Sequence, residues 1–255
     1  MVTRSLTLTA LARLPLIKAG DDLGMLLIAA LRAEQIVPRD KDVLVIAQKV
    51  VSKAEGRLVD LNTVVPSAGA VVLAGEVNKD ARLVEVILSE SSEVIRHRRD
   101  VLIVAHRLGY VMANAGVDQS NVAGEDSNQV LLLPRDPDKS AAALKERLDR
   151  EFCVNIGVVI NDSFGRPWRL GVVGIALGIA GLPAMHNMVG VPDLFGRKMR
   201  VTEIATADEI AAAASLLMGQ GAEGHPAVLL RGLDWTAPSA LASALIRPKE
   251  LDMFR

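Results

Sequence analysis

Two short polar segments of the chain each carry an aspartate among small side chains. Asp118 lies in Asn114–Asn128 and Asp162 lies in Asn161–Arg169, and both segments contain glycine, hydroxyl and amide residues. Mg²⁺ and Mn²⁺ bind a few carboxylate oxygens and leave positions open for phosphate oxygens. The two aspartates are therefore candidate ligands of a divalent metal ion. The structural alternative, and the more common one for a single aspartate, is that each caps a turn through its own backbone.

Neutral oxygen ligands and cations accompany these aspartates. Ser163 follows Asp162 directly, and Gln220 lies farther along the chain. Lys53, Arg57, Arg166 and Arg169 lie within the polar segments Gln48–Arg57 and Asn161–Arg169. Phosphate recognition uses such charges, although they could equally form a solvated basic face. Because metal and phosphate must be neutralised together, acids and bases in the same segments favour metal-assisted phosphate chemistry.

A glycine-rich segment, Met218–Pro226, follows a helical pattern and precedes an apolar run. Its three glycines allow a ligand to approach the backbone closely, while Gly219 alone would be explained by helix termination. Neither a GxxxxGK[ST] loop nor a GxGxxG after a strand occurs, so no standard nucleotide motif is present. The four histidines are dispersed, and only His225 lies in a candidate segment.

Composition limits the classes of function that the chain can serve. Its formal net charge is −1, from 29 basic and 30 acidic residues, without the clustered basic excess of a nucleic-acid or membrane surface. The most apolar stretch, Gly171–Met185, is shorter than the ~20 residues of a membrane helix, and no signal peptide is recognisable. We expect a soluble, cytoplasmic protein in which the single cysteine, Cys153, is a small buried hydrophobe.

The elements that must position these residues mix helices and strands. Apolar runs rich in β-branched residues predict strands at Asp42–Ala47, Val101–Ala105, Val130–Leu133, Val154–Ile160 and Ala227–Leu230. Helical spacing predicts helices from Asp21–Asp22 to Leu31, and at Leu83–Arg96, Asp138–Arg150 and Ala207–Met218. Since no helix separates Val101–Ala105, Gly109–Ala113 and Val130–Leu133, we do not expect a regular βαβ winding. We predict an α+β fold with two lobes and a boundary near Pro134–Asp138, and we expect the polar segments to be loops at strand ends.

Several of these segments together resemble a known family. The matching strings are LPLIKAGDDL (Leu14–Leu23), VVSKAEGR (Val50–Arg57), NAGVDQSNV (Asn114–Val122), LLLPRDPDKSA (Leu131–Ala141), NDSFGRPWRLGVVGIALGIAG (Asn161–Gly181) and ADEIAAAASLLMGQGAEGHPAVLLRG (Ala207–Gly232). They occur in family order over most of the chain. The chain resembles the coenzyme F420-0:L-glutamate ligases, the gamma-glutamyl ligases of F420 biosynthesis.

The resemblance implies a fold and a reaction. The implied fold is a two-lobed α+β arrangement with mixed sheets in an intertwined homodimer. The implied reaction uses GTP and two Mg²⁺ or Mn²⁺ ions per subunit, with K⁺ as a stimulant in some members. The F420-0 carboxylate attacks the GTP γ-phosphate, and L-glutamate then displaces phosphate from the acyl phosphate to form an amide. Further glutamates can join through γ-carboxyl linkages.

The resemblance also implies roles for individual residues. Asp118 and Asp162 match the ligands of the first metal, Ser163 and Gln220 match those of the second, and Lys53 is a phosphate-facing cation that acts with the two aspartates in catalysis. The positions that match the GTP contacts are Leu14, Pro15, Leu16, Ile17, Gln48, Lys53, Asn121, Met218, Gly219, Gln220, Gly221, Ala222, Glu223, Gly224 and His225.

The chain departs from the family pattern at two positions. Gln48 stands where some members have serine or threonine, and Gln220 stands where others have glutamate, which makes the second metal site one charge weaker. The chain reaches Arg255 without the flavin-binding domain that some bacterial homologues carry, so the whole chain is expected to be one family domain. A non-catalytic homologue and an amide ligase for another carboxylate are the alternatives. Retention of Asp118, Asp162, Lys53 and Asn121 argues against the first.

Overall fold

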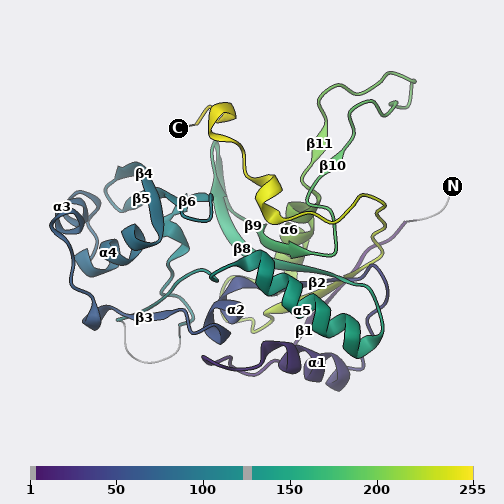
Figure 1. Cartoon of the computed structure of the whole chain (residues 1–255), viewed down its shortest axis with the longest axis horizontal. Helices are drawn as coiled ribbons and strands as arrows, with labels where there is room; N and C mark the ends of the chain where they lie inside the picture. Colours follow the sequence, from purple (N-terminus) through teal and green to yellow (C-terminus); the bar gives the residue numbers. More distant parts are fainter. Residues whose placement is uncertain (1–3, 123–127, 255) are drawn as a thin grey trace.

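A five-stranded mixed sheet forms the centre of the protein. The computed structural model describes residues 4–122 and 128–254. The strands of this sheet, in spatial order, are β1 (Thr7–Leu11), β12 (Ala227–Arg231), β2 (Val43–Ala47), β8 (Gly157–Arg166) and β9 (Arg169–Ala180) (Figure 1). Strands β2 and β8 run parallel, with Val45 beside Val159, and the other neighbours are antiparallel.

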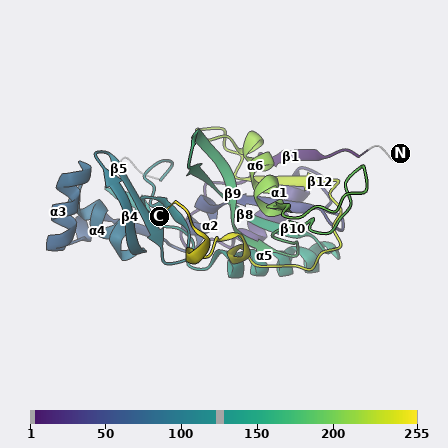
Figure 2. The same cartoon turned by 90° about the horizontal axis from the view of Figure 1, so that it is seen from above.

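Helices cover both faces of this sheet, which explains why β2 and the start of β8 are continuously apolar. Helices α1 (Leu23–Ala33) and α5 (Pro137–Phe152) pack on the face that carries Val158 and Ile160. Helix α6 (Thr206–Met218) packs on the opposite face, against Val159. Figure 2 shows α5 and α6 on opposite sides of the strands. The alternation of side chains along β8 therefore divides the core into two layers.

The helix ends follow the chemistry of their sequences. Asp22 accepts the N–H of Met25 to cap α1, and Asp136 accepts the N–H of Lys139 to cap α5. The predicted helices before Leu31, at Asp138–Arg150 and at Ala207–Met218 are confirmed, with ends shifted by a few residues. Cys153 is exposed, contrary to our expectation, because it ends α5 in the left-handed region (φ 54°) instead of continuing the apolar run.

A second group of elements forms from the middle of the chain. Strand β3 (Leu58–Asp60) pairs with β7 (Gln129–Leu131), and a three-stranded sheet orders β4 (Ser91–Arg98), β5 (Val101–His106) and β6 (Val111–Ala113). Helices α3 (Ala68–Val77) and α4 (Ala81–Ser89) pack beside them (Figure 1). One hydrophobic cluster, built entirely from residues between 59 and 132, holds this group together. The α+β class with mixed sheets is confirmed, while the two-lobe division and its boundary at Pro134–Asp138 stay predictions.

The predicted helix Leu83–Arg96 is wrong in its second half. Helix α4 ends at Ser89, and β4 begins at Ser91 and pairs with β5. Glu90, between them, is held by Arg57 and His106 from elsewhere in the fold. The helical spacing of apolar residues continues in the sequence through β4, but these tertiary contacts determine the structure instead.

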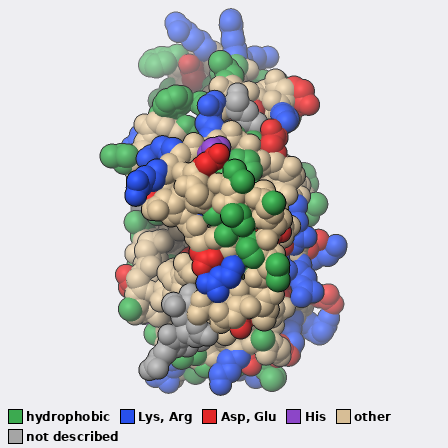
Figure 3. All heavy atoms as spheres, turned by 90° about the vertical axis from the view of Figure 1, so that its left-hand side faces the viewer, with side chains coloured by type: hydrophobic (Ala, Val, Ile, Leu, Met, Phe, Trp, Pro, Cys, Tyr) green, Lys and Arg blue, Asp and Glu red, His purple; other side chains and the backbone are tan. Residues whose placement is uncertain are grey.

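A long arm joins β9 to α6. It contains β10 (His186–Asn187) paired with β11 (Glu203–Ile204) and projects away from the sheet (Figure 1). The short 3-10 helices are η1 (Leu61–Thr63), η2 (Asn114–Gly116), η3 (Ala242–Leu245) and η4 (Lys249–Leu251). Over the described ranges, no helix has both the length and the apolar character needed to cross a membrane. On the face at the α3–α4 end, basic and acidic side chains are interspersed (Figure 3).

Candidate metal and nucleotide site

Segments that are distant in sequence meet beyond the end of β2. Lys49 Nζ lies 2.6 Å from Asp118 Oδ2, and Lys53 Nζ donates to the carbonyl of Asn121 at 2.6 Å. The Asn121 amide in turn donates to the carbonyl of Gly221 at 3.0 Å. The polar segments around Gln48, Asp118 and the glycine-rich string therefore lie next to one another, and the prediction that they form one site stays a prediction.

Helix α2 (Gln48–Ala54) carries the cations of this site. We expected a loop here, but α2 begins directly after β2, with Ala47 in an extended conformation. Lys49 and Lys53 are four residues apart and so lie on one face of the helix. Burial lowers the pKa of Lys53, and the nearby charge of Lys49 lowers it further. Gln48 is buried and accepts the Ser52 hydroxyl at 2.9 Å, so its amide serves the helix packing.

Asp118 follows a strained turn. Asn114, Ala115 and Gly116 all have positive φ, at 52°, 53° and 68°, a conformation that costs energy in a residue with a Cβ. Asp118 then pairs through its backbone with Leu131. Its carboxylate accepts the Ser120 N–H at 2.7 Å, so the turn-capping alternative is also realised. Residues 123–127 of the predicted segment Asn114–Asn128 lie outside the described residues.

Opposing effects set the protonation of Asp118. Burial alone would raise the pKa of this carboxyl group, but the hydrogen bonds and charge of Lys49, together with the Ser120 N–H, lower it below its ordinary value. Asp118 is therefore ionised at neutral pH. It presents a carboxylate that is already compensated by one cation.

Asp162 lies on β8, so the prediction that Asn161–Arg169 forms a loop is wrong. Strand β8 continues to Arg166 because β9 pairs with it along its whole length, although β2 ends beside Asn161. Asp162 is partly buried, and its pKa is raised to about 6. Burial is the main cause; the Ser163 N–H opposes it, the charge of Asp118 raises the pKa further, and Lys49 lowers it. The two carboxylates are thus close enough to repel, and a bound cation would relieve that repulsion.

The four predicted metal ligands divide between two faces of β8. Ser163 follows Asp162 in an extended strand, so its side chain points to the opposite face. That is the face of α6, where the Asn161 amide donates to Ser215 Oγ at 2.9 Å. Gln220 is exposed just beyond α6. Within the described part of the chain, no three Asp, Glu, His or Cys side chains gather as a metal-binding group, so the site offers two carboxylates and neutral oxygens.

The glycine-rich segment begins where α6 ends. Met218 is buried at the helix end, while Gly219 and Gly224 adopt positive φ. The Glu223 carboxylate accepts the Gly221 N–H at 2.8 Å, and its pKa is lowered by its own backbone N–H and by those of Gly221 and Gln220. The Glu223 carboxylate itself occupies the point where these N–H groups converge, so a phosphate would bind there only by displacing it. His225 Nδ1 lies 3.3 Å from the Leu217 carbonyl, near the end of α6.

The segment Leu14–Ile17 borders this region. Ile17 is buried and Leu14 packs against the same core, whereas Leu16 is 87 % exposed. The chain then contacts α2, because the Gly20 N–H donates to the Ala54 carbonyl at 3.0 Å. An exposed apolar side chain held next to an anchored one suits contact with a flat ligand such as a nucleotide base.

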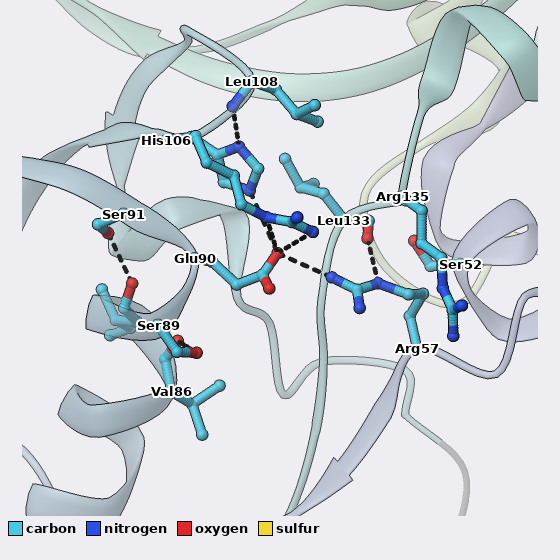
Figure 4. Close-up of polar contacts among 12 residues, drawn as sticks. Ser52, Arg57, Val86, Ser89, Glu90, Ser91, His106, Leu108, Leu133 and Arg135 are labelled. Carbon is cyan, nitrogen blue, oxygen red and sulfur yellow. Dashed lines mark hydrogen bonds and ion pairs between the residues drawn. The ribbon is translucent and has the colours of Figure 1, made fainter.

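Arg57 has a structural role rather than the phosphate-binding role that its sequence position suggested. Its guanidinium lies 2.7 Å from Glu90 Oε2 and also donates to the Leu133 carbonyl at 2.9 Å. Figure 4 shows Arg57 and His106 pointing toward Glu90, and Arg107 Nη2 lies 3.1 Å from Glu90 Oε2. Burial raises the pKa of Glu90, but the His106 hydrogen bond and the two arginine charges outweigh it and lower the pKa to about 2.

Lys49 is the residue of the site that the sequence analysis missed. It contacts Asp118 and Ser120 directly and influences the charge of Asp162. In sequence it is one lysine in a polar segment. A helical assignment of Gln48–Ala54 would have placed it on the same face as Lys53.

Comparison with known proteins identifies the family. A model of the F420-0:gamma-glutamyl ligase family matches residues 12–232. The relative from Methanothermobacter thermautotrophicus is named coenzyme F420:L-glutamate ligase and is 44 % identical, covering 98 % of this chain and 99 % of its own. Relatives of the same name from Methanopyrus kandleri (44 %, covering 94 % and 93 %) and Archaeoglobus fulgidus (43 %, covering 95 % and 93 %) agree. The chain therefore belongs to the F420-0:gamma-glutamyl ligase family of amide-bond-forming enzymes.

Proposed function

We propose that this protein joins L-glutamate to coenzyme F420-0 in F420 biosynthesis, using GTP and a divalent metal ion, Mg²⁺ or Mn²⁺. The convergence of Asp118 and Asp162 with two lysines and the glycine-rich segment is the observation that supports GTP and metal. Carboxylates, cations and backbone N–H groups in one place are what a metal–triphosphate complex requires. The substrates follow from the names of the relatives.

The proposed reaction has two steps. A carboxylate oxygen of F420-0 attacks the γ-phosphorus of GTP, the bond to the β-phosphate oxygen breaks, and GDP leaves. The glutamate amine then attacks the carbonyl carbon of the acyl phosphate, the carbon–oxygen bond breaks, and inorganic phosphate leaves as the amine loses a proton. Activation is needed because a carboxylate oxygen is a poor leaving group. Holding the reactants in line contributes much of the remaining rate.

The charge of each residue in the site would determine what it binds. Asp118 and Asp162 would hold a divalent ion, and Ser163 with Gln220 would offer neutral oxygens for a second on the other face of β8. When bound, such ions neutralise charge on the transferring phosphoryl group. Lys53 and the N–H groups of the glycine-rich segment would hold the phosphates in place. The close pair of carboxylates fits this use, because burial and the charge of Asp118 raise the pKa of Asp162 to about 6, and a bound cation would favour the ionised form.

We also propose that the protein acts as a homodimer. The arm 186–204 exposes large apolar side chains, Leu194 at 99 %, Phe195 at 90 % and Val201 at 86 %. A two-stranded ribbon is marginally stable alone in water, so an arm of this composition needs a surface to pack against. A second copy of the chain would supply that surface.

The test of the function is a glutamylation assay. Purified protein with F420-0, GTP, Mn²⁺ and L-glutamate should release GDP and phosphate and give a product heavier by one glutamate residue, observed by mass spectrometry. GTP binding without any product would favour a non-catalytic homologue. Turnover of another carboxylate in place of F420-0 would favour a ligase of different specificity.

A substitution links that activity to the site. Asp162→Asn should lower turnover at least a hundredfold while the thermal unfolding temperature is maintained, because the amide keeps the shape but removes a charge that is costly to bury. The exposed control Glu250→Gln should keep wild-type activity. Activity of Asp162→Asn within a few-fold of wild type would exclude Asp162 from the metal site.

A further inference from the structure

The β8–β9 hairpin extends from the metal site to an exposed tip. Its pairing runs from Asp162 beside Ile175 to Arg166 beside Arg169, beyond the end of β2. At ~3.3 Å per residue, Arg166 lies about 13 Å along the strand from Asp162. In Figure 1 the hairpin rises from the sheet to the C-terminal segment. Any substrate that reaches outward from Asp162 along this hairpin meets its tip.

The tip presents a large aromatic side chain in a strained conformation. Trp168 is 87 % exposed and has φ 64°, and Leu170 beside it is 99 % exposed. After Pro167, positive φ at the next turn position is ordinarily taken by glycine or asparagine. A bulky residue there costs energy, and strain of this kind gathers at functional sites. The Trp168 ring also lies 6.0 Å from that of Phe254, tilted by 57°.

Two arginines flank this aromatic side chain. Arg166 and Arg169 are paired in register across the end of the hairpin. Arg166 donates to the Gly171 carbonyl at 3.2 Å, and neither arginine forms an ion pair with an acid among residues 4–122 and 128–254. Guanidinium groups bind phosphate or carboxylate through paired hydrogen bonds and stack on flat rings. The tip therefore combines positive charge with aromatic surface.

The hairpin leaves open space beside these side chains. No atom lies within 4 Å of the position that a Cβ would take on Gly165 or Gly171. Val172, which pairs with Gly165, is 53 % exposed. A flat molecule can thus approach the backbone closely next to Trp168 without displacing a side chain.

We propose that the hairpin tip, through Trp168, Arg166 and Arg169, binds the ring and the anionic tail of the acceptor substrate while its reactive carboxylate lies at Asp162. This inference rests on the proposed function, in which the acceptor is F420-0. A deazaflavin has a flat ring that suits Trp168 and the open glycines, and its anionic tail complements two arginines. The distance along the hairpin lets one molecule span both places.

Direct binding tests the proposal independently of turnover. F420-0 is titrated into the full-length protein and followed by the fluorescence of its deazaflavin ring. Trp168→Gly removes the ring of the side chain and also relieves the positive φ, so it should raise the Kd for F420-0 about tenfold without lowering the unfolding temperature. Arg166→Gln and Arg169→Gln should each raise the Kd several-fold, more strongly at low salt. GTP affinity should stay within twofold in all three variants.

Matched controls separate the tip from general surface effects. Val65→Ala removes an exposed apolar side chain and Arg99→Gln removes an exposed guanidinium elsewhere, and both should bind F420-0 like wild type. Trp168→Phe keeps an aromatic ring and should restore most of the affinity lost in Trp168→Gly.

Each remaining outcome overturns a defined claim. Wild-type turnover with unchanged F420-0 affinity in Trp168→Gly would exclude the tip as the ring site and leave the proposed function standing. Conversion of Trp168→Gly to a monomer, measured by light scattering, would show that the tip contacts a second copy instead. Wild-type protein that neither binds nor glutamylates F420-0 would overturn the tip site and the proposed function together.

Discussion

At the scale of single residues, Lys49 compensates the charge that Asp118 and Asp162 bring together. Its ammonium contacts Asp118 and Ser120, and it lowers the pKa of Asp162 while Asp118 raises it. A divalent ion on the same carboxylates would have to displace this contact and would be repelled by the ammonium. We therefore predict that Lys49 tunes metal affinity as well as local charge.

Lys49→Gln should raise Mn²⁺ affinity about threefold to tenfold, because the metal no longer competes with the ammonium for Asp118. Isothermal titration calorimetry measures this change. Lys53→Gln is the matched control, since Lys53 lies one turn away and contacts the Asn121 carbonyl instead. It should leave Mn²⁺ affinity within twofold and weaken GTP binding. Weaker Mn²⁺ binding by Lys49→Gln would contradict the compensating role.

The sequence allowed part of this site to be predicted at residue level. The grouping of acids and bases in polar segments indicated Asp118, Asp162 and Lys53 as candidates, and the structure brings their segments together. The sequence could not show that Arg57 differs from these candidates. The partner of Arg57, Glu90, lies 33 residues away, and only the fold brings the two side chains together. Whether Gln220 holds a second metal ion stays a prediction.

At the scale of elements, the long helices α5 and α6 were predictable from the sequence, and the polar second half of strand β8 was not. Helices α5 and α6 have local signals, namely an aspartate cap on α5 and acidic residues in the first turn of each. Strand β8 beyond Ile160 is a strand only because β9 pairs with it, which is a long-range contact. Helix α2 was expected to be a loop because its polar residues suggested ligand chemistry. Local sequence pattern therefore fails to predict secondary structure where long-range strand pairing determines it.

The docking of α5 on β9 leads to a prediction about Gly178. A Cβ on this residue would lie 2.3 Å from the backbone carbon and oxygen of Pro137, which begins α5 and cannot move like a side chain. Gly178→Ala should lower the free energy of unfolding by about 1–3 kcal/mol, measured by urea denaturation. Gly75→Ala, on the exposed side of α3, should instead raise it by about 0.5–1 kcal/mol. Equal effects of the two substitutions would contradict this view of the packing.

At the scale of the whole molecule, the Glu90 cluster joins the middle segment to the rest of the fold. Arg57 follows α2, Glu90 lies between α4 and β4, and His106 ends β5. His106 Nδ1 accepts the Leu108 N–H, so Nε2 carries the proton that faces Glu90. The Glu90 and Arg57 side chains are 10 % and 13 % exposed, whereas Arg107 is 44 % exposed. Salt therefore screens the Arg57–Glu90 pair less than the Arg107–Glu90 pair.

The pKa of Glu90 predicts acid sensitivity. Because folding lowers this pKa from 4.5 to about 2, the ionised cluster stabilises the protein above pH 4.5, and the stabilisation is lost as the pH falls towards 2. Glu90→Gln should lower the free energy of unfolding by roughly 3 kcal/mol at pH 7 and flatten its decline between pH 4.5 and 2. Urea denaturation across this range measures both effects. An acid profile equal to that of wild type would contradict the role of Glu90.

The arm 186–204 leads to a prediction about the oligomeric state. Its tip is preformed, since Asp193 Oδ1 accepts the N–H groups of Phe195 and Arg197 at 2.8 and 2.9 Å. The apolar side chains at this tip are therefore held outward instead of collapsing onto the protein. Light scattering should give wild-type protein twice the chain mass of 27.2 kDa. The double substitution Leu194→Ser and Phe195→Ser should give one chain mass, whereas Val65→Ser should not. A monomeric wild type would show that the arm serves a different partner.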